Sequence, residues 1–271
     1  MSQSVDRALT ILVSCAGAPR RLGELADELA VHKSTALRLL QALERRAFMR
    51  RTHDGLWAIG FGLTDVAQAA LDHIDVRVAA RPHLSRLGRE LGHTLHLAEL
   101  SGTDVVYVDK VEGDGAVRMR SRVGAAAQLH TAGVAKVVIA FAPDEVRRTA
   151  LASASYQRFT ATTLTSPAAL ARQLDGVRAR GWAVDDGECE DYLSCVAVPI
   201  RDHTGAVAAG MSLTALRAIE PLDALTRHIP DLTRAAARIS RELGWDGRKG
   251  LDEPAEAGSD RNGFTLAERS R

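Results

Sequence analysis

The chain has few cysteines and few aromatic residues. Of its 271 residues, 3 are cysteines, and phenylalanine, tryptophan and tyrosine together make up 4%. The number of cysteines is odd, and none of them shows CxxC spacing: Cys15, Cys189 and Cys195. This argues against a disulfide framework and a structural zinc site. We therefore expect reduced thiols, no metal and no cofactor.

Long apolar runs and an N-terminal leader are also missing. No stretch of about 18 apolar residues occurs, and no charged-then-apolar segment begins the chain. Secretion and membrane insertion are not expected, so the sequence predicts a cytoplasmic protein that does not bind membranes. A strong excess of charge of one sign is lacking too, since the formal net charge is +1.

The remaining composition is that of an ordinary globular protein. Hydrophobic residues make up 46% of the chain and charged residues 25%, and the length suits one large or two medium domains. The charge is unevenly divided. Residues 1–60 carry nine Lys/Arg and six Asp/Glu, a net charge of +3, whereas the rest of the chain has a net charge of −2.

Residues 22–43 have the pattern of two short amphipathic helices joined by a turn. Apolar residues recur at helical spacing on both sides of a break at 30–32, so the two helices share a small core. This helix-turn-helix pattern is typical of DNA-binding domains, although a plain helical hairpin shows the same periodicity. The expected DNA contacts lie on the outer face of the second helix: Lys33, Ser34, Thr35, Arg38 and Gln41.

The neighbouring sequence completes a winged domain and favours the DNA-binding interpretation. Ser4 is expected to cap a first helix from Val5 to about Ala16. A turn at 53–55 followed by a short strand at 56–60 indicates a β-hairpin wing. Basic residues beside the motif add further expected DNA contacts: Arg20, Arg50 and Arg51. The sequence therefore predicts a winged helix-turn-helix domain over 1–62.

The rest of the chain predicts a second domain of mixed helices and strands. We expect a linker helix at 63–78, the second domain at 79–245 and a disordered, charged tail at 246–271. Pro82 is expected to interrupt the helical segment 76–91. The expected strands are 94–100, 105–111, 116–122, 182–184, 194–200 and 206–212. The expected helices are 131–142, one from 143, 167–180 and 222–243. This order indicates an α+β fold around one mostly antiparallel sheet.

Three separated segments resemble the IclR family of bacterial transcriptional regulators. They are 4–12 with the helix-turn-helix, LHTAGVAK at 129–136, and RGWAVDD at 180–186 leading to CVAVPIRDHTG at 195–205. The resemblance covers about residues 4–245. It implies a winged N-terminal domain, a linker helix, and a GAF-like or profilin-like C-terminal domain that binds a small molecule. It also implies a homodimer or homotetramer on palindromic double-stranded operator DNA, with repression favoured over activation.

The resemblance further implies an effector site in the second domain. Family contact positions fall on Gly133, Val134, Asp185, Leu193, Cys195, Ser212 and Thr214, with Met119 on an apolar wall. Residues 131–134 open an expected helix, whose free N–H groups and dipole attract an anion such as a carboxylate. Gly133 allows a ligand to approach the backbone closely. A small acid is therefore the expected effector.

The chain departs from the family pattern at several positions. Ala30 stands where helix-turn-helix turns often carry glycine, and His32 stands where proline or a capping residue is more usual. The operator sequence therefore does not transfer from the family. Tyr192 and Ser194 replace a common glycine and arginine just before the cysteine, which changes the expected rim of the pocket.

Two other functions use some of the same residues. Cys195, His130 and Asp185 are the residue types of a thiol-based catalytic triad, but the cysteine lies in an apolar strand where thiols gain little reactivity. A metal sensor using His130, Cys189 and Cys195 lacks clustered ligand spacing. His130 also suits a hydrogen-bonded core position, and Cys195 suits a small core position. We therefore do not expect an enzyme.

Overall fold

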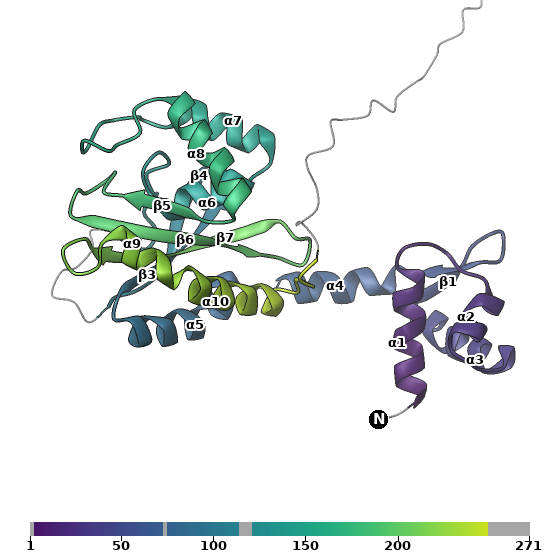
Figure 1. Ribbon diagram of the computed structural model, residues 1–271. Coiled ribbons are helices and arrows are strands. Elements are labelled where there is room, and N and C mark those ends of the chain that lie inside the picture. Colours follow the sequence, from purple (N-terminus) through teal and green to yellow (C-terminus); the bar gives the residue numbers. More distant parts are fainter. Residues whose placement is uncertain (1–2, 73–74, 114–120, 249–271) are drawn as a thin grey trace, which may run out of the picture. The chain divides into compact units, whose positions relative to one another are not determined.

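The structure is a computed structural model that describes residues 3–72, 75–113 and 121–248 (Figure 1). The chain divides into two compact units, Met1–Ile74 and Asp75–Arg271. The expected linker segment 63–78 spans α4 (Gly62–Asp72) and the first residues of α5 (Val76–Leu91). Within the described ranges, no helix combines the length and the hydropathy that crossing a membrane requires.

The N-terminal unit has the expected winged helix-turn-helix architecture. Its elements before α4 are α1 (Gln3–Cys15), α2 (Leu22–Glu28), α3 (Lys33–Glu44), β1 (Met49–Arg51) and β2 (Trp57–Ile59). The two strands pair antiparallel, and Gly55 in their connection has a φ of +80°. Side chains from α1, α2, α3 and both strands share one core: Ile11, Cys15, Leu25, Leu40, Met49 and Trp57.

The first helix and the helix-turn-helix turn differ in detail from expectation. Ser4 is not the cap of the first helix, because α1 begins at Gln3 and takes Ser4 into its first turn. Ala30 adopts a φ of +51°, the left-handed conformation that glycine usually supplies. His32 is the N-cap of α3, and its Nδ1 accepts a hydrogen bond from the backbone N–H of Ser34 at 3.3 Å. His32 therefore performs the capping that its position requires.

The C-terminal unit is an α+β domain, as the sequence predicts. After α5, its elements are β3 (Thr94–Ser101), β4 (Asp104–Val111), α6 (Gly133–Phe141), α7 (Asp144–Ser153), α8 (Pro167–Arg180), β5 (Ala183–Asp186), β6 (Leu193–Arg201), β7 (Val207–Leu216), α9 (Leu222–Leu225), η1 (Thr226–His228) and α10 (Ile229–Glu242). Among the described residues, five strands form one sheet in the order β4-β3-β7-β6-β5, with every neighbouring pair antiparallel.

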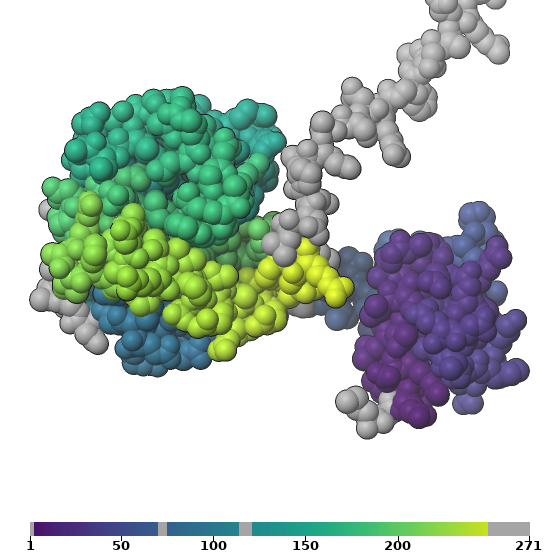
Figure 2. Space-filling model, in the orientation of Figure 1, coloured from purple at the N-terminus to yellow at the C-terminus, as the bar shows by residue number. Residues whose placement is uncertain are grey.

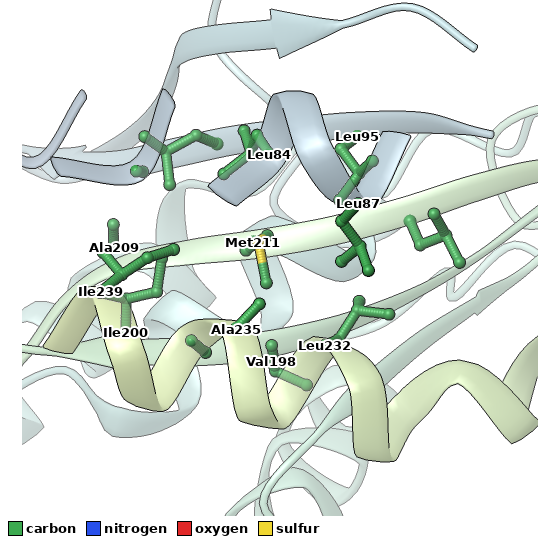
Figure 3. Close-up of a cluster of buried hydrophobic side chains, with 14 of the residues drawn as sticks. Leu84, Leu87, Leu95, Val198, Ile200, Ala209, Met211, Leu232, Ala235 and Ile239 are labelled. Carbon is green, nitrogen blue, oxygen red and sulfur yellow. The ribbon is translucent and has the colours of Figure 1, made fainter. Parts of the chain in front are cut away.

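Helices cover both faces of this sheet (Figure 1). On one face, α5 and α10 pack on side chains such as Leu95, Val198 and Met211 (Figure 3). On the other face, α6 and α8 form a second core that includes Ala98 and Ala197. Figure 2 shows the outer surfaces of the two helical layers, teal to green for α7 and α8 and yellow-green for α10. Alternate residues of each strand thus belong to different cores, as the pleat requires.

Some expected elements of this unit are different in the structure. Pro82 does not interrupt its helix but lies inside α5, because the loss of one backbone donor is offset by the buried side chains that anchor the helix, including Leu84 and Leu87. The expected helix 222–243 is divided into α9, η1 and α10, with Pro230 in the first turn of α10. Most of the expected strand 116–122 lies outside the described residues.

Candidate functional site

The outer face of α3 carries the polar residues that the sequence singles out. Ala36 and Leu40 are buried and hold the helix against the rest of the unit. The opposite face is exposed and presents Lys33, Ser34, Thr35, Arg38 and Gln41. The size of an α-helix matches the major groove, and such side chains offer donors to phosphates and base edges. The geometry therefore suits a groove-reading helix.

The three other basic candidates differ from one another. Arg50 and Arg51 are exposed on β1, and each places its guanidinium near an aromatic ring, that of Phe61 at 5.7 Å and that of Trp57 at 5.6 Å. Arg20 instead makes ion pairs within its unit, from Nε to Glu24 at 3.0 Å and from Nη2 to Glu28 at 3.8 Å. The charge of Arg20 is thus partly compensated by its neighbours, whereas Arg50 and Arg51 are exposed and lie near aromatic rings.

A cavity of about 420 Å³ lies within the C-terminal unit, between the start of α6 and the sheet. Its walls include every described member of the expected effector set: Gly133, Val134, Asp185, Leu193, Cys195, Ser212 and Thr214. Met119, expected on an apolar wall, lies outside the described residues. The volume is in the range of small-molecule sites. Residues more than 80 positions apart in sequence thus converge on one cavity.

Three of these residues form a single row across the sheet. Asp185 on β5 pairs with Cys195 on β6, Cys195 pairs with Thr214 on β7, and Thr214 pairs with Thr94 on β3. Ser212, two residues before Thr214, lies on the same face and pairs with His96. The row brings a carboxyl, a thiol and hydroxyl groups to one wall of the cavity.

The helix α6 supplies the opposite wall with backbone donors. Its N-cap residue, Ala132, has no side chain that can satisfy the first-turn N–H groups. Gly133 and Val134 open the helix and line the cavity. The N–H of Gly133 is hydrogen-bonded to the sulfur of Cys195. The positive end of the helix dipole still favours an anion beside the first turn. The opening of α6 is thus chemically suited to a carboxylate.

Burial controls the protonation of three groups in the cavity. It raises the pKa of Asp185 to about 7, although Lys136 opposes the shift and the carboxylate accepts a hydrogen bond from the N–H of Glu188 at 2.7 Å. It raises the pKa of the Cys195 thiol to about 12 and lowers the pKa of His96 to about 3. At neutral pH the thiol is therefore protonated, the imidazole is neutral, and Asp185 can donate or accept a proton.

Several cavity residues were not predicted from the sequence. His96 makes a hydrogen bond through Nε2 with the hydroxyl of Ser121 at 2.7 Å, and its ring lies 5.3 Å from that of Tyr107. Other walls come from Arg122, Ala125, Ala126, Ala127, Gln128, Ala132, Phe159, Cys189 and Glu190. The strand alternation around His96 was a usable signal, because Leu95 and Leu97 belong to the opposite core.

A fully buried ion pair stands behind the cavity. Lys136 on α6 is 0% exposed, and its Nζ donates to Glu188 at 2.7 Å and to the side-chain oxygen of Gln173 at 3.1 Å. Glu188 is joined to Asp185 by the backbone hydrogen bond already described. Together with Gln173, the pair therefore connects α6 and α8 to the loop after β5, which carries Glu188.

The residues of the catalytic and metal-sensor alternatives are not arranged for those functions. His130 is buried, makes its Nε2 hydrogen bond with the carbonyl of Gln157 at 3.0 Å, and stacks on Phe159. Cys195 keeps its proton, as its raised pKa requires. Within the described part of the chain, His130, Cys189 and Cys195 do not form a group that could hold a metal ion. His130 is thus a core histidine.

Comparisons with known proteins agree on one kind of protein. Residues 68–241 match the family model for the bacterial transcriptional regulator IclR C-terminal domain, and residues 4–53 match that for the IclR helix-turn-helix domain. The transcriptional regulator XynR of Escherichia coli is 32% identical over 246 residues, 90% of this chain and 98% of XynR. The transcriptional repressor AllR of Klebsiella pneumoniae is 30% identical over 216 residues, 79% of each chain. The crystal structure of Thermotoga maritima IclR has 30% identity and a TM-score of 0.60, covering 90% of this chain and 100% of that one.

Proposed function

The chain belongs to the IclR family of bacterial transcriptional regulators, and on that premise we propose that it is a repressor released or retained on its operator by a small acid. It is a DNA-binding regulator and not an enzyme. Residues 1–62 are the proposed DNA-binding domain, 63–78 the linker, 79–245 the effector and oligomerisation domain, and 246–271 the tail. Operator DNA and metabolites meet in the bacterial cytoplasm, which is the proposed location.

Exposed residues of α3 and the wing are the proposed DNA contacts. Lys33, Ser34, Thr35, Arg38 and Gln41 enter the major groove, and Arg50 and Arg51 hold the flanking phosphates. Arg20 is also a proposed phosphate contact. On binding DNA, its guanidinium leaves the ion pair with Glu24 and pairs with a phosphate. Repression is supported by the printed name of the relative AllR, a transcriptional repressor.

The cavity at the start of α6 is the proposed effector site, and one observation carries this proposal. The first turn of α6, whose N-cap residue makes no side-chain hydrogen bond, and the row that contains Asp185 and Thr214 border the same cavity of about 420 Å³. An effector carboxylate lies beside Gly133 and takes the N–H group of Val134, while Ser212 and Thr214 donate hydroxyl hydrogen bonds. A protonated Asp185 adds a donor, which a carboxylate ligand needs and a cationic ligand does not.

Control of transcription follows from a difference in effector affinity between two arrangements of a homodimer or homotetramer. Paired recognition helices must fit half-sites on one face of the duplex, so a change in their spacing removes one set of contacts. An effector shifts this equilibrium only as far as its affinities for the two arrangements differ. DNA binding and effector binding are therefore coupled without sharing a residue.

The experiment combines operator binding with candidate acids. Fluorescence anisotropy with DNA from the protein's own promoter region measures affinity, and metabolites of the neighbouring genes' pathway are added in turn. We expect at least one small acid to change the operator affinity by about 5- to 150-fold, the usual range of allosteric coupling. Identical binding in the presence of every acid, including those shown by calorimetry to bind, would refute effector control but leave DNA binding intact.

Substitutions in the cavity test whether effector recognition is independent of operator binding. Asp185→Asn and Ser212→Ala are expected to keep operator affinity and to lose the effector response, because both side chains line the cavity in the C-terminal unit. Ser153→Ala is the matched control, since Ser153 is exposed on α7 and does not line the cavity. If Asp185→Asn abolished operator binding as well, its role would be in folding and not in effector recognition.

A further inference from the structure

Two histidines and a glutamate from three separate segments meet in the C-terminal unit. His93 lies between α5 and β3, Glu220 lies between β7 and α9, and His228 is the last residue of η1. Their possible ligand atoms, one from each residue, all lie within 4.8 Å of one another. In the described part of the chain, this is the group of His, Cys, Asp and Glu side chains with the geometry to hold a metal ion.

Both imidazoles turn the same nitrogen toward one carboxylate. The Nε2 of His228 is 2.8 Å from Oε1 of Glu220, and the Nε2 of His93 is hydrogen-bonded to Oε2 of the same residue. The two rings are 6.3 Å apart between centroids and inclined by 68°. The three donor groups thus converge from different directions on one point, as ligands of a single ion do.

The exposure of the group suits a bound ion with open positions. The side chains of His93, Glu220 and His228 are 16%, 19% and 24% exposed. They are therefore held by their surroundings, which lowers the entropy lost when they coordinate, but solvent still reaches them. A structural site that is closed to water would need a fourth protein ligand.

We propose that His93, Glu220 and His228 bind a divalent transition-metal ion, with Zn²⁺ as the reference ion and water in the remaining positions. Imidazole nitrogen and carboxylate oxygen are the ligands that Zn²⁺ and related ions take at about 2.0–2.2 Å. An ion between the three groups replaces the two hydrogen bonds by coordination and releases any proton held on a coordinating Nε2. Hard ions such as Mg²⁺ prefer oxygen ligands and fit this donor set poorly.

The site joins two strands that also build the cavity. His93 directly precedes Thr94, which pairs with Thr214 on β7, and Glu220 follows the end of β7 at Leu216. A bound ion therefore fixes the start of β3, the segment after β7 and η1 to one another. This role is structural and independent of the effector, so it stands even if the proposed effector site is wrong.

The test begins with the full-length chain without an affinity tag, after treatment with a chelator. Isothermal titration with ZnCl₂ is expected to give one ion per chain, and Zn K-edge X-ray absorption is expected to show two imidazole ligands and no sulfur. The absorption spectrum needs no variant, so it remains decisive if a substitution disturbs folding. Sulfur ligands in the spectrum would place the zinc elsewhere, and no uptake of zinc after gel filtration would mean that the three residues form a hydrogen-bonded cluster only. Either result would overturn the proposal.

Substitutions locate the ion. His93→Gln, His228→Gln and Glu220→Gln keep side-chain hydrogen-bonding capacity, and each is expected to weaken Zn²⁺ binding by more than about tenfold, since even outer-sphere partners cost 10- to 100-fold. His83→Ala is the matched control, because His83 pairs with Glu242 at 2.7 Å without a second histidine. Equal losses of zinc affinity in the control and in the site variants would contradict the assignment.

Discussion

A Cβ atom placed on Gly133 would lie 2.7 Å from the Sγ of Cys195. Real Cβ atoms do not approach a heavy atom so closely, so α6 reaches the sheet at this point only because residue 133 has no side chain. The contact joins the opening of the helix to the middle of the Asp185–Cys195–Thr214 row. Glycine at position 133 and the thiol at position 195 are therefore two parts of one packing arrangement.

The first prediction follows from this contact. Gly133→Ala is expected to destabilise the C-terminal unit by about 1–3 kcal/mol, the usual cost of an added carbon in a packed interior. The double variant Gly133→Ala/Cys195→Ala is expected to recover part of the loss, because the sulfur that meets the new methyl group is removed. Thermal unfolding of the two variants, with Cys195→Ala alone as control, measures the recovery. No recovery would mean that another neighbour limits residue 133.

The second prediction concerns the buried ion pair. Lys136→Met leaves Glu188 buried without its cation and is expected to cost about 3–5 kcal/mol, whereas Lys136→Met/Glu188→Leu is expected to cost less. Urea unfolding followed by hydrogen exchange of peptides from α6 measures both. Asp175→Asn is the control, since its pair with Arg147 is exposed on the aspartate side and is worth about 0–1 kcal/mol. A double variant as unstable as the single one would contradict this account.

The third prediction is a pH dependence caused by Asp185. Its pKa rises from an ordinary 3.8 to about 7 on folding, so between these values the folded chain holds a proton that the unfolded chain has lost. The contribution of Asp185 to the free energy of unfolding is therefore greatest below about pH 4. It falls by roughly 1.4 kcal/mol per pH unit as the pH rises to about 7. Asp185→Asn is expected to remove that slope, as thermal melts at a series of pH values will show. Parallel wild-type and variant curves would place the titration elsewhere.

The fourth prediction concerns DNA. Arg38→Ala is expected to weaken specific operator binding by about 1–3 kcal/mol, because Arg38 is exposed on the outer face of α3. Arg86→Ala removes the same charge from α5 in the other unit and serves as control. Competition anisotropy with operator and scrambled duplexes separates a base contact from a phosphate contact. Equal weakening on both duplexes would assign Arg38 to the phosphates.

Much of the fold was predictable because its signals are local. The period of apolar residues indicated the helices. The expected helix 167–180 is α8, which Ser166 caps at its N-terminus and Gly181 ends in the left-handed conformation. The two failures have different causes. Pro82 stays inside α5 because tertiary packing holds the helix, which local propensity cannot predict. Pro230 lies in the first turn of α10, a local signal that the prediction of one helix over 222–243 did not use.

The site was predictable only where the family resemblance supplied it. Gly133, Asp185 and Thr214 give no local sign of proximity, since their meeting depends on the strand register and on the approach of α6. His96 was missed because a single histidine in a strand resembles a satisfied core residue. The cluster of His93 and Glu220 was missed because 127 positions separate its members.

The cross-strand row determines how this cavity can change in evolution or in the laboratory. Point substitutions at positions 185, 195 or 214 exchange one wall group for another and leave the sheet intact. A one-residue insertion within β7 is different, because it would bring Leu213 or Ala215 into the row in place of Thr214 and turn a core side chain toward the cavity. If the proposed effector site is correct, variant libraries that aim at a new effector specificity should use substitutions and keep strand lengths fixed.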